Sequence, residues 1–332
     1  MSKSVQAWAE EIRAGDPRAL ARAITAVESR APESRELLRL LFPHSGRASI
    51  IGLTGAPGSG KSTLADQLAH EFRQQGRSVG IVAVDPSSPF SGGAILGDRI
   101  RMQRHHADRG IYIRSMATRG ALGGLAAATA EVAMLLDASG RDAVLIETVG
   151  VGQDEIDIAR LADMTLVVLV PGMGDDVQSI KAGIMEIADI FVINKCDRDG
   201  AAELERSIRA LQATATLSAS PGDSTAAFLG GSGWVPPVIK TVASEGRGIV
   251  ELATAIAEFQ AHLQKTELGQ RRRIENWRRR LVEMLRSELM QRLTRDYLSE
   301  ESARQMASEI AAGRKDPYTV LEGILAKIGK RE

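Results

Sequence analysis

The segment GAPGSGKST at residues 55–63 constrains the fold of this chain more than any other stretch. It fits G-x-x-x-x-G-K-[ST], follows the apolar run SIIGLT and precedes the helical stretch STLADQLAHEF, so it predicts a strand, a phosphate-binding loop and a helix. Glycines let backbone N–H groups surround a phosphate at the helix amino terminus. Lys61 is expected to reach the β- and γ-phosphates, and Ser62 to bind Mg²⁺. The expected nucleotide-binding residues of this segment are Gly55, Ala56, Pro57, Gly58, Ser59, Gly60, Lys61, Ser62 and Thr63.

Short apolar runs alternate with helical stretches from residue 46 to about residue 260. The runs SVGIVAVD, RDAVLIET, MTLVVLV and DIFVINK are rich in Val and Ile and mostly lack apolar–polar alternation. That pattern is expected of strands covered on both faces, so the predicted fold class is α/β, a mostly parallel sheet with helices on each side.

Helical sequence flanks this central part, and we predict three segments. Residues 1–45 are expected to form a helical extension, in which Asp16 and Pro17 mark a helix start. Residues 46–262 form the nucleotide-binding domain, and residues 263–332 form a helical arm. The basic runs at 271–273 and 278–280 are interpreted as the solvated back of an amphipathic helix, with phosphate binding as the alternative.

Acidic residues at strand ends are candidates for the metal site. Glu147 ends the run AVLIET, and Gly150 follows as in an ExxG loop, where glycine allows a backbone N–H to approach the γ-phosphate. Asp85 ends another strand, and Asp98 lies in a glycine-rich segment that γ-phosphate and Mg²⁺ would order. The sequence leaves open which carboxylate binds the metal.

The segment NKCD at residues 194–197 predicts a guanine-binding site. It follows the apolar strand DIFVI, at the sheet edge where open α/β folds bind ligands. The Asp197 carboxylate accepts from guanine N1–H and the exocyclic amine, whereas adenine would face it with a lone pair. Lys195 is expected to lie along the base, and Asn194 to brace the loop. Val242, Ala243 and Ser244 are candidates to offer a backbone N–H to guanine O6, and Cys196 is interpreted as a small filler.

These motifs, with the blocks VAVDPSS, GGAILGDRIRM, LGGLAAAT, ETVGVGQDE and GDDVQSIKAGIMEIADIFVINK, resemble the MeaB/ArgK family of P-loop GTPases. The resemblance covers nearly the whole chain. It implies a Ras-like G domain and a homodimer formed through the carboxy-terminal arm. It also implies a GTPase that gates B12 delivery to an adenosylcobalamin-dependent acyl-CoA mutase, notably methylmalonyl-CoA mutase, and protects that mutase.

The resemblance also implies roles for individual residues. Lys61, Asp98 and Glu147 would be catalytic, and the metal set would be Ser62, Asp85, Asp98 and Glu147. Residues 171–181 match a segment that relays the nucleotide state. The switch and relay residues would be Gly150, Gln153, Asp175 and Lys181. Gln153 lies two residues too late to match the water-orienting glutamine of other small GTPases.

The expected ligands are GTP or GDP and Mg²⁺, with no tightly bound organic cofactor. The expected partners are the mutase and, as a further alternative, its adenosyltransferase. Basic and acidic residues balance at 42 each, which gives no overall signature of nucleic-acid binding. One cysteine, no secretory signal and no apolar run long enough to span a bilayer favour a cytoplasmic protein.

Two rival functions stay open. A nickel-inserting metallochaperone GTPase shares the P-loop but usually carries a histidine- or cysteine-containing metal site. Here the adjacent pair His105 and His106 is the only histidine cluster, and we interpret it as a solvated helix surface. An ATPase or kinase associated with transport, the label attached to ArgK-like sequences, is disfavoured by the guanine-type NKCD segment.

Overall fold

The computed structural model describes residues 4–85, 105, 107–117, 124–148, 161–172, 187–218 and 233–328. The chain divides into two compact units, Met1–Asn276 and Trp277–Glu332. The boundary falls inside the long helix α13 (Glu267–Tyr297).

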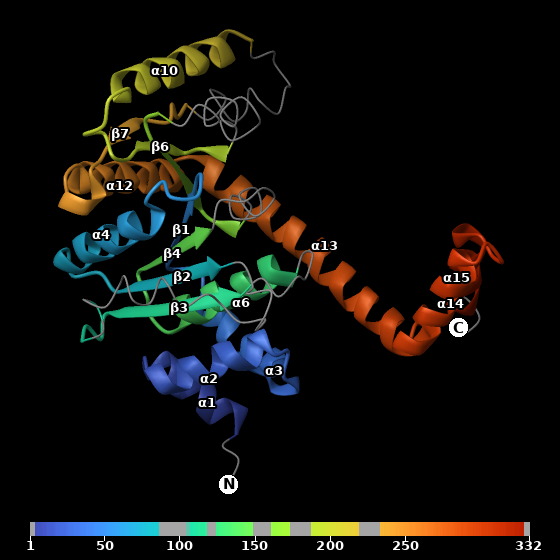
Figure 1. Ribbon diagram of the computed structural model, residues 1–332. Coiled ribbons are helices and arrows are strands. Elements are labelled where there is room, and N and C mark those ends of the chain that lie inside the picture. The colour runs from blue at the N-terminus through green and yellow to red at the C-terminus, as the bar shows by residue number, and fades with distance from the viewer. Residues whose placement is uncertain are drawn as a thin grey trace. The chain divides into compact units, whose positions relative to one another are not determined.

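A parallel sheet forms the centre of the first unit (Figure 1). Within the described residues it has seven strands in the order β3-β2-β4-β1-β5-β6-β7, and every pair of neighbours is parallel. This confirms the predicted fold class. The strands are β1 (Ser49–Thr54), β2 (Val79–Asp85), β3 (Ile111–Ala117), β4 (Ala143–Thr148), β5 (Met164–Leu169), β6 (Ile190–Ile193) and β7 (Val238–Lys240).

Two helices cover one face of the sheet, α4 (Lys61–Gln74) and α12 (Ile249–Lys265) (Figure 1). Their apolar sides pack with the sheet in one core cluster, which includes Phe72 of α4 and Phe259 of α12, both fully buried. Burying an aromatic side chain of this size removes a large apolar area from water. The helix that follows the phosphate loop is therefore fixed against the sheet.

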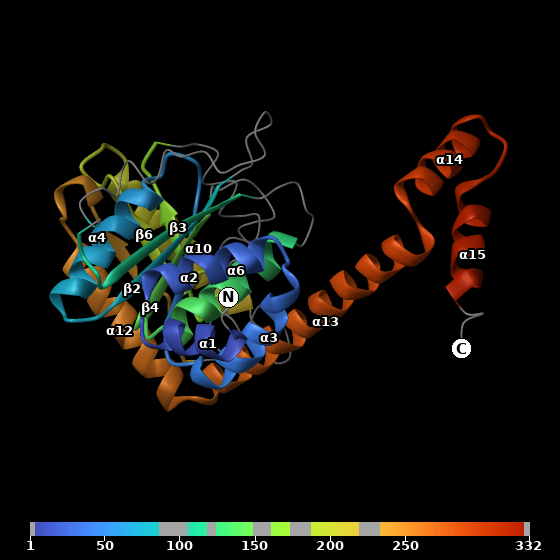
Figure 2. The same ribbon diagram turned by 90° about the horizontal axis from the view of Figure 1, so that it is seen from below.

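The opposite face is covered by α6 (Gly124–Ala138) and the amino-terminal helices (Figure 2). These are α1 (Val5–Arg13), α2 (Pro17–Glu28) and α3 (Pro32–Leu41), followed by the short helix η1 (Phe42–His44). The Asp16 carboxylate accepts a hydrogen bond from the Ala19 N–H at 2.6 Å, so the predicted cap forms. The amino-terminal helices share one apolar core with α6 and the sheet.

The Asp137 carboxylate, at the end of α6, fastens the chain that enters β1. It accepts hydrogen bonds from the N–H groups of Gly46, Arg47 and Ala48, the last at 2.9 Å. Buried carboxylates need such partners, because an unpaired charge out of water is costly. The bond network thereby sets the position at which β1 begins.

Helix α10 (Ala201–Ser218) packs beside β6 and β7 in a third, smaller core cluster. The first turns of α13 are attached to the base of β6. Arg272 donates to both carboxylate oxygens of Asp189, at 2.7 and 3.0 Å, and its guanidinium lies over the Phe259 ring. The part of α13 before Trp277 is therefore held within the first unit.

The second unit consists of the rest of α13 with α14 (Glu300–Ala311) and α15 (Pro317–Ile328). Many large apolar side chains of this unit are exposed. They are Trp277, Leu281, Val282, Met284, Leu285, Leu289, Met290, Tyr318, Leu321 and Leu325. Among the described residues, no helix combines the length and the apolar character needed to cross a membrane.

Candidate nucleotide site

The phosphate loop connects β1 to α4 at the carboxyl edge of the sheet. Gly55 and Gly60 both adopt positive φ, 139° and 91°. A Cβ at Gly55 would collide with the Val168 carbonyl, and one at Gly60 with the side-chain amide of Asn194. Positive φ and the lack of space both require glycine at these two positions. The predicted loop thus has the backbone geometry that its sequence pattern implies.

Two buried or partly buried lysines hold the carbonyl groups of the loop. Lys61 Nζ donates to the carbonyls of Gly55, at 2.7 Å, and Ala56, at 3.0 Å. Lys195 Nζ donates to the Gly58 carbonyl at 2.7 Å. Because these lysine ammonium groups bind its carbonyl oxygens, the phosphate loop has a defined shape. The loop leads into the amino terminus of α4, where the helix dipole favours an anion.

Asn194 joins three segments and is only 2% exposed. Its Nδ2 donates to the Ser59 carbonyl at 2.8 Å, and its Oδ1 accepts from the Thr241 hydroxyl and the Ala243 N–H, both at 3.1 Å. These contacts agree with the bracing role predicted for Asn194. Thr241 was not identified from the sequence, although its position between β7 and the candidate base-binding residues Val242–Ser244 could have indicated it.

The residues predicted to read the base follow Asn194 directly. Lys195 has φ of 55°, an uncommon conformation for a side chain other than glycine, and its stem spans back to the phosphate loop. Asp197 is exposed. Cys196 packs against the core cluster below β6 and donates its N–H to the Thr241 carbonyl at 3.1 Å. Its packing supports the interpretation as a filler.

The three candidates for a backbone donor to the base differ in what they already bind. The Val242 N–H donates to the Arg247 carbonyl at 3.0 Å, and the Ala243 N–H donates to Asn194. Ser244 lies in the first turn of η4 (Ala243–Glu245), where helical N–H groups lack carbonyl partners within the helix. Of the three, Ser244 is the best placed to donate to a base.

Ser62 and Glu147 lie together where Mg²⁺ is expected. Ser62 Oγ donates to Glu147 Oε1 at 2.6 Å, and Glu147 is buried on β4 beside Leu53 of β1. Hydroxyl and carboxylate oxygens are ligands that Mg²⁺ prefers, so these two residues fit the ion. Asp85 is the last residue of β2. The other predicted metal, switch and relay residues lie outside the described residues: Asp98, Gly150, Gln153, Asp175 and Lys181.

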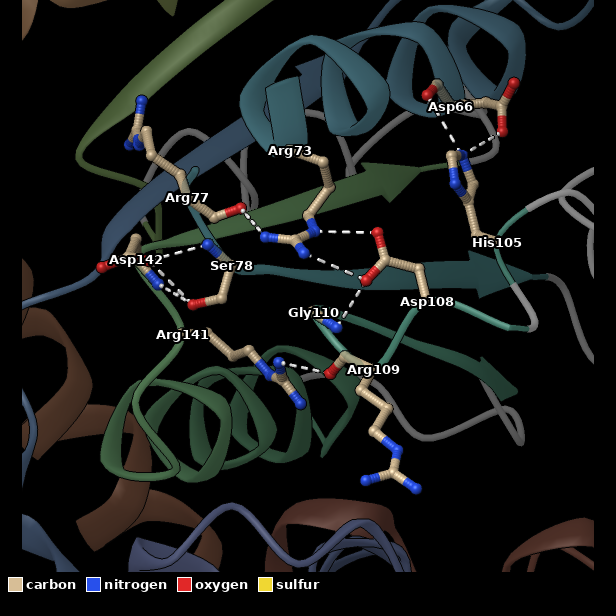
Figure 3. A network of polar contacts seen from close by, with 10 residues as sticks. All are labelled: Asp66, Arg73, Arg77, Ser78, His105, Asp108, Arg109, Gly110, Arg141 and Asp142. Atoms are coloured by element: carbon tan, nitrogen blue, oxygen red, sulfur yellow. Dashed lines mark hydrogen bonds and ion pairs between the residues drawn. The ribbon is translucent and has the colours of Figure 1, made fainter. Parts of the chain in front are cut away.

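His105 contradicts its predicted solvated setting. It is buried, and its Nε2 lies 2.7 Å from Asp66 Oδ1 on α4 (Figure 3). The pair of adjacent histidines did not indicate burial, because His105 is paired with Asp66, which is 39 residues away in the sequence. His106 lies outside the described residues. Within those residues, no group of three His, Cys, Asp or Glu side chains is arranged to hold a metal ion.

Comparisons with known proteins agree with this geometry. A family model described as "Methylmalonyl Co-A mutase-associated GTPase MeaB" matches residues 20–297. A "Putative GTPase" of Pyrococcus abyssi is 45% identical over 322 residues, which cover 96% of this chain and 95% of that protein. "GTPase ArgK" of Escherichia coli is 38% identical over 256 residues, 76% of this chain and 75% of that one. A crystal structure described as "LAO/AO transport system kinase" covers 99% of both chains with a TM-score of 0.70 and 28% identity.

Proposed function

The chain belongs to the family of methylmalonyl Co-A mutase-associated GTPases, and on this basis we propose that it gates cofactor delivery to an adenosylcobalamin-dependent acyl-CoA mutase. The gating would be driven by GTP binding and hydrolysis, and the same protein would protect the mutase from inactivation. The observation that carries the proposal is the family match over residues 20–297, joined to a site suited to guanine nucleotides.

Guanine selection would come from Asp197, with Lys195 along the base and the Ser244 N–H toward O6. The hydrogen bond from Asn194 to the Ser59 carbonyl supports this assignment, because it sets the base-reading loop and the phosphate loop at a fixed separation. A nucleotide must contact both loops at once. A preset separation lowers the ordering cost of binding.

Hydrolysis would depend on Mg²⁺ held by Ser62 and Glu147, with Asp85 and Asp98 as further carboxylate candidates. The ion would neutralise charge on the β- and γ-phosphates. Lys61 would stabilise the same charge from the start of α4, and Asp98 and Glu147 would act around the attacking water. Their proposed role follows from their positions in the family motifs.

The carboxy-terminal arm would form a homodimer. Its exposed apolar side chains, such as Leu281, Leu285 and Leu289, support this, because a contiguous apolar surface on a helix favours burial against another chain. The mutase would be the partner whose cofactor traffic depends on the bound nucleotide, and its adenosyltransferase would be a further partner.

Binding to a purified acyl-CoA mutase tests the proposal most directly. Gel filtration of the two proteins should show a complex whose stability differs between GDP and a non-hydrolysable GTP analogue. B12 transfer to the mutase should require hydrolysable GTP. The Asp197→Asn variant should lose the nucleotide effect with guanine nucleotides and regain it with xanthine nucleotides.

Two results would instead favour the rivals. Equal competition by ATP and GTP would point toward an ATPase or kinase. Absence of binding to every methylmalonyl- and isobutyryl-CoA mutase tested, together with nickel binding, would point toward a metallochaperone. If the protein bound no mutase but still hydrolysed GTP, the partner assignment would be wrong and the nucleotide assignment would stand.

A further inference from the structure

Three neighbouring strands begin in register at the sheet edge opposite the nucleotide site. Val79 of β2 is paired with Ile111 of β3 and with Ala143 of β4. An arginine stands two residues before each of these strand starts, and the last turn of α4 contributes a fourth. We call these four residues the arginine edge: Arg73, Arg77, Arg109 and Arg141 (Figure 3).

Two of these arginines are held by the same type of helix ending. Helix α4 is followed by Gly76 at φ 79° and α6 by Gly140 at φ 83°. The next residues, Arg77 and Arg141, each donate their N–H to the carbonyl five residues earlier, at 2.9 and 3.2 Å. This is the Schellman arrangement, which fixes the backbone of the residue after the glycine. The arginine positions are therefore set by the fold.

Both aspartates near the arginine edge are already occupied. The Asp108 carboxylate accepts from Arg73 Nε at 2.8 Å and Nη2 at 3.1 Å. The Asp142 carboxylate accepts from the Ser78 N–H at 2.7 Å and the Ser78 hydroxyl at 2.8 Å. In the part of the chain that the structure describes, no ion pair joins either carboxylate to the remaining three arginines. The edge thus has four guanidinium groups and two carboxylates.

Arg141 is the most unusual member, because it is only 9% exposed. Its Nη1 donates to the Arg109 carbonyl at 3.2 Å, and its Nε is buried with no hydrogen-bond partner among the described residues (Figure 3). Burial lowers the pKa of Arg141 and the positive charge of Arg73 lowers it further, whereas Asp108 and Asp142 oppose this shift without cancelling it. A desolvated guanidinium with unused donors is costly unless an anion accompanies it.

The negative ends of helix dipoles offset only part of the excess of four guanidinium groups over two carboxylates at the arginine edge. The carboxyl ends of α4 and α6 each present about half a negative charge to the edge. Arg73 lies in the last turn of α4, and its Nη1 donates to the Arg77 carbonyl, beyond the helix end, at 3.0 Å. Together the two helix ends offset about one of the two surplus positive charges. Asp108 and Asp142 act on Arg141 without an ion pair to it, and about one positive charge remains over the arginine edge as a whole.

We propose that the arginine edge binds a phosphate-type oxyanion, with Arg141 as the central ligand and Arg109 as the exposed second ligand. A planar guanidinium presents two parallel N–H groups that match two oxygens of a phosphate. Figure 3 shows the Arg109 side chain leaving the backbone beside the Arg141 guanidinium, on the same side of the strands. The Arg77 side chain turns the other way, over the Phe72 ring, and adds its charge from a distance.

Calorimetric titration with inorganic phosphate tests this site. The protein is first saturated with Mg²⁺ and a non-hydrolysable GTP analogue, so that the phosphate loop is filled, and ionic strength is matched with chloride. Wild type should bind one phosphate per chain. Arg141→Gln should bind at least about tenfold more weakly, because a charge-assisted hydrogen bond is lost. Arg39→Gln, at an exposed arginine of α3, should bind like wild type.

Because Arg141 is buried, Arg109→Gln provides a second variant whose side chain is exposed. It should also weaken phosphate binding while leaving the unfolding temperature unchanged. Unaltered phosphate affinity in both variants, or no phosphate binding by wild type above the chloride baseline, would overturn the proposal. Acetate binding as tightly as phosphate would overturn the assigned ligand class. Glycerol phosphate, used as a second probe, distinguishes a phosphate monoester from free phosphate as the source of the group.

Discussion

The side-chain amide of Asn194 donates to the carbonyl of Ser59 at 2.8 Å, so one hydrogen bond ties the predicted base-reading loop at residues 194–197 to the phosphate loop. The same side chain accepts from Thr241 and Ala243. Replacing it with alanine would leave three buried partners unsatisfied. We expect Asn194→Ala to lower the free energy of unfolding by about 3 kcal/mol and to weaken GDP binding more than tenfold.

Urea unfolding and titration with a fluorescent GDP analogue measure the two effects. Asn276→Ala is a suitable control, because its hydrogen bond to the Ala162 carbonyl is long, at 3.4 Å, and far from the loops in sequence. Thr241→Val removes one donor without changing shape and should weaken GDP binding by a smaller factor, about two- to tenfold. An unchanged GDP affinity in Asn194→Ala would show that the two loops are positioned independently.

Asp197→Asn should exchange guanine for xanthine preference. The exposed carboxylate is expected to accept from guanine N1–H and the amine, and an amide in its place pairs better with the xanthine carbonyl. Competition of GTP, XTP and ATP against a fluorescent GDP analogue checks this. Because the Asp197 side chain is exposed, the unfolding curve of the variant should match that of wild type. Retained guanine preference would place the selecting group elsewhere.

Gly60→Ala should abolish nucleotide binding more completely than Gly58→Ala. Both glycines have positive φ, but only at Gly60 does an added Cβ collide with Asn194, whereas a Cβ at Gly58 meets no atom within 4 Å. Gly58→Ala therefore suffers only the backbone cost of about 1 to 2 kcal/mol. Equilibrium binding of the GDP analogue to both variants separates backbone strain from collision. Equal losses would show that the collision is irrelevant.

Asp189 should contribute a distinct pH dependence to stability. Burial raises the pKa of Asp189, and the opposing effect of Arg272 does not cancel it. A carboxyl with a raised pKa in the folded chain binds more protons folded than unfolded. Its contribution to the free energy of unfolding is greatest below the unfolded pKa of about 3.9 and is lost as the pH rises through the folded pKa.

We therefore expect the free energy of unfolding of wild type to fall relative to that of Asp189→Asn as the pH rises from the unfolded pKa of Asp189 to its folded pKa. Urea unfolding of both proteins at a series of pH values measures it. Arg272→Gln should extend the interval upward, because the charge that favours the ionised carboxylate is removed. Parallel pH profiles for wild type and Asp189→Asn would show that the carboxyl has an ordinary pKa.

The local geometry of the phosphate loop could be predicted because its constraints lie close together in the sequence. Gly55, Lys61 and the strand and helix around them fall within residues 49–74, so their spacing predicts their contacts. The parallel sheet was predictable for a similar reason, because each strand is a continuous apolar run. These features depend on local pattern rather than on the path of the chain.

Features that depend on distant pairing were not predictable. The sequence could not separate Ser244 from Val242 and Ala243, because the difference arises from bonds to Arg247 and Asn194. The burial of His105 depends on Asp66 of another element. Arg77, Arg109 and Arg141 are equally spaced in the sequence, yet their alignment matters only once the three strand starts are known to be in register.

The position of Asn194 against Gly60 also decides how base choice can be re-engineered. Any library that varies Asn194 changes the room available to the phosphate loop, so most members would lose the nucleotide altogether rather than accept a new one. Asp197 is exposed and stands outside that packing. Substitutions at Asp197 and Ser244 would test alternative bases while the contacts of the phosphate loop stay unchanged. The chain is therefore a workable scaffold for a switch that responds to a non-natural nucleotide.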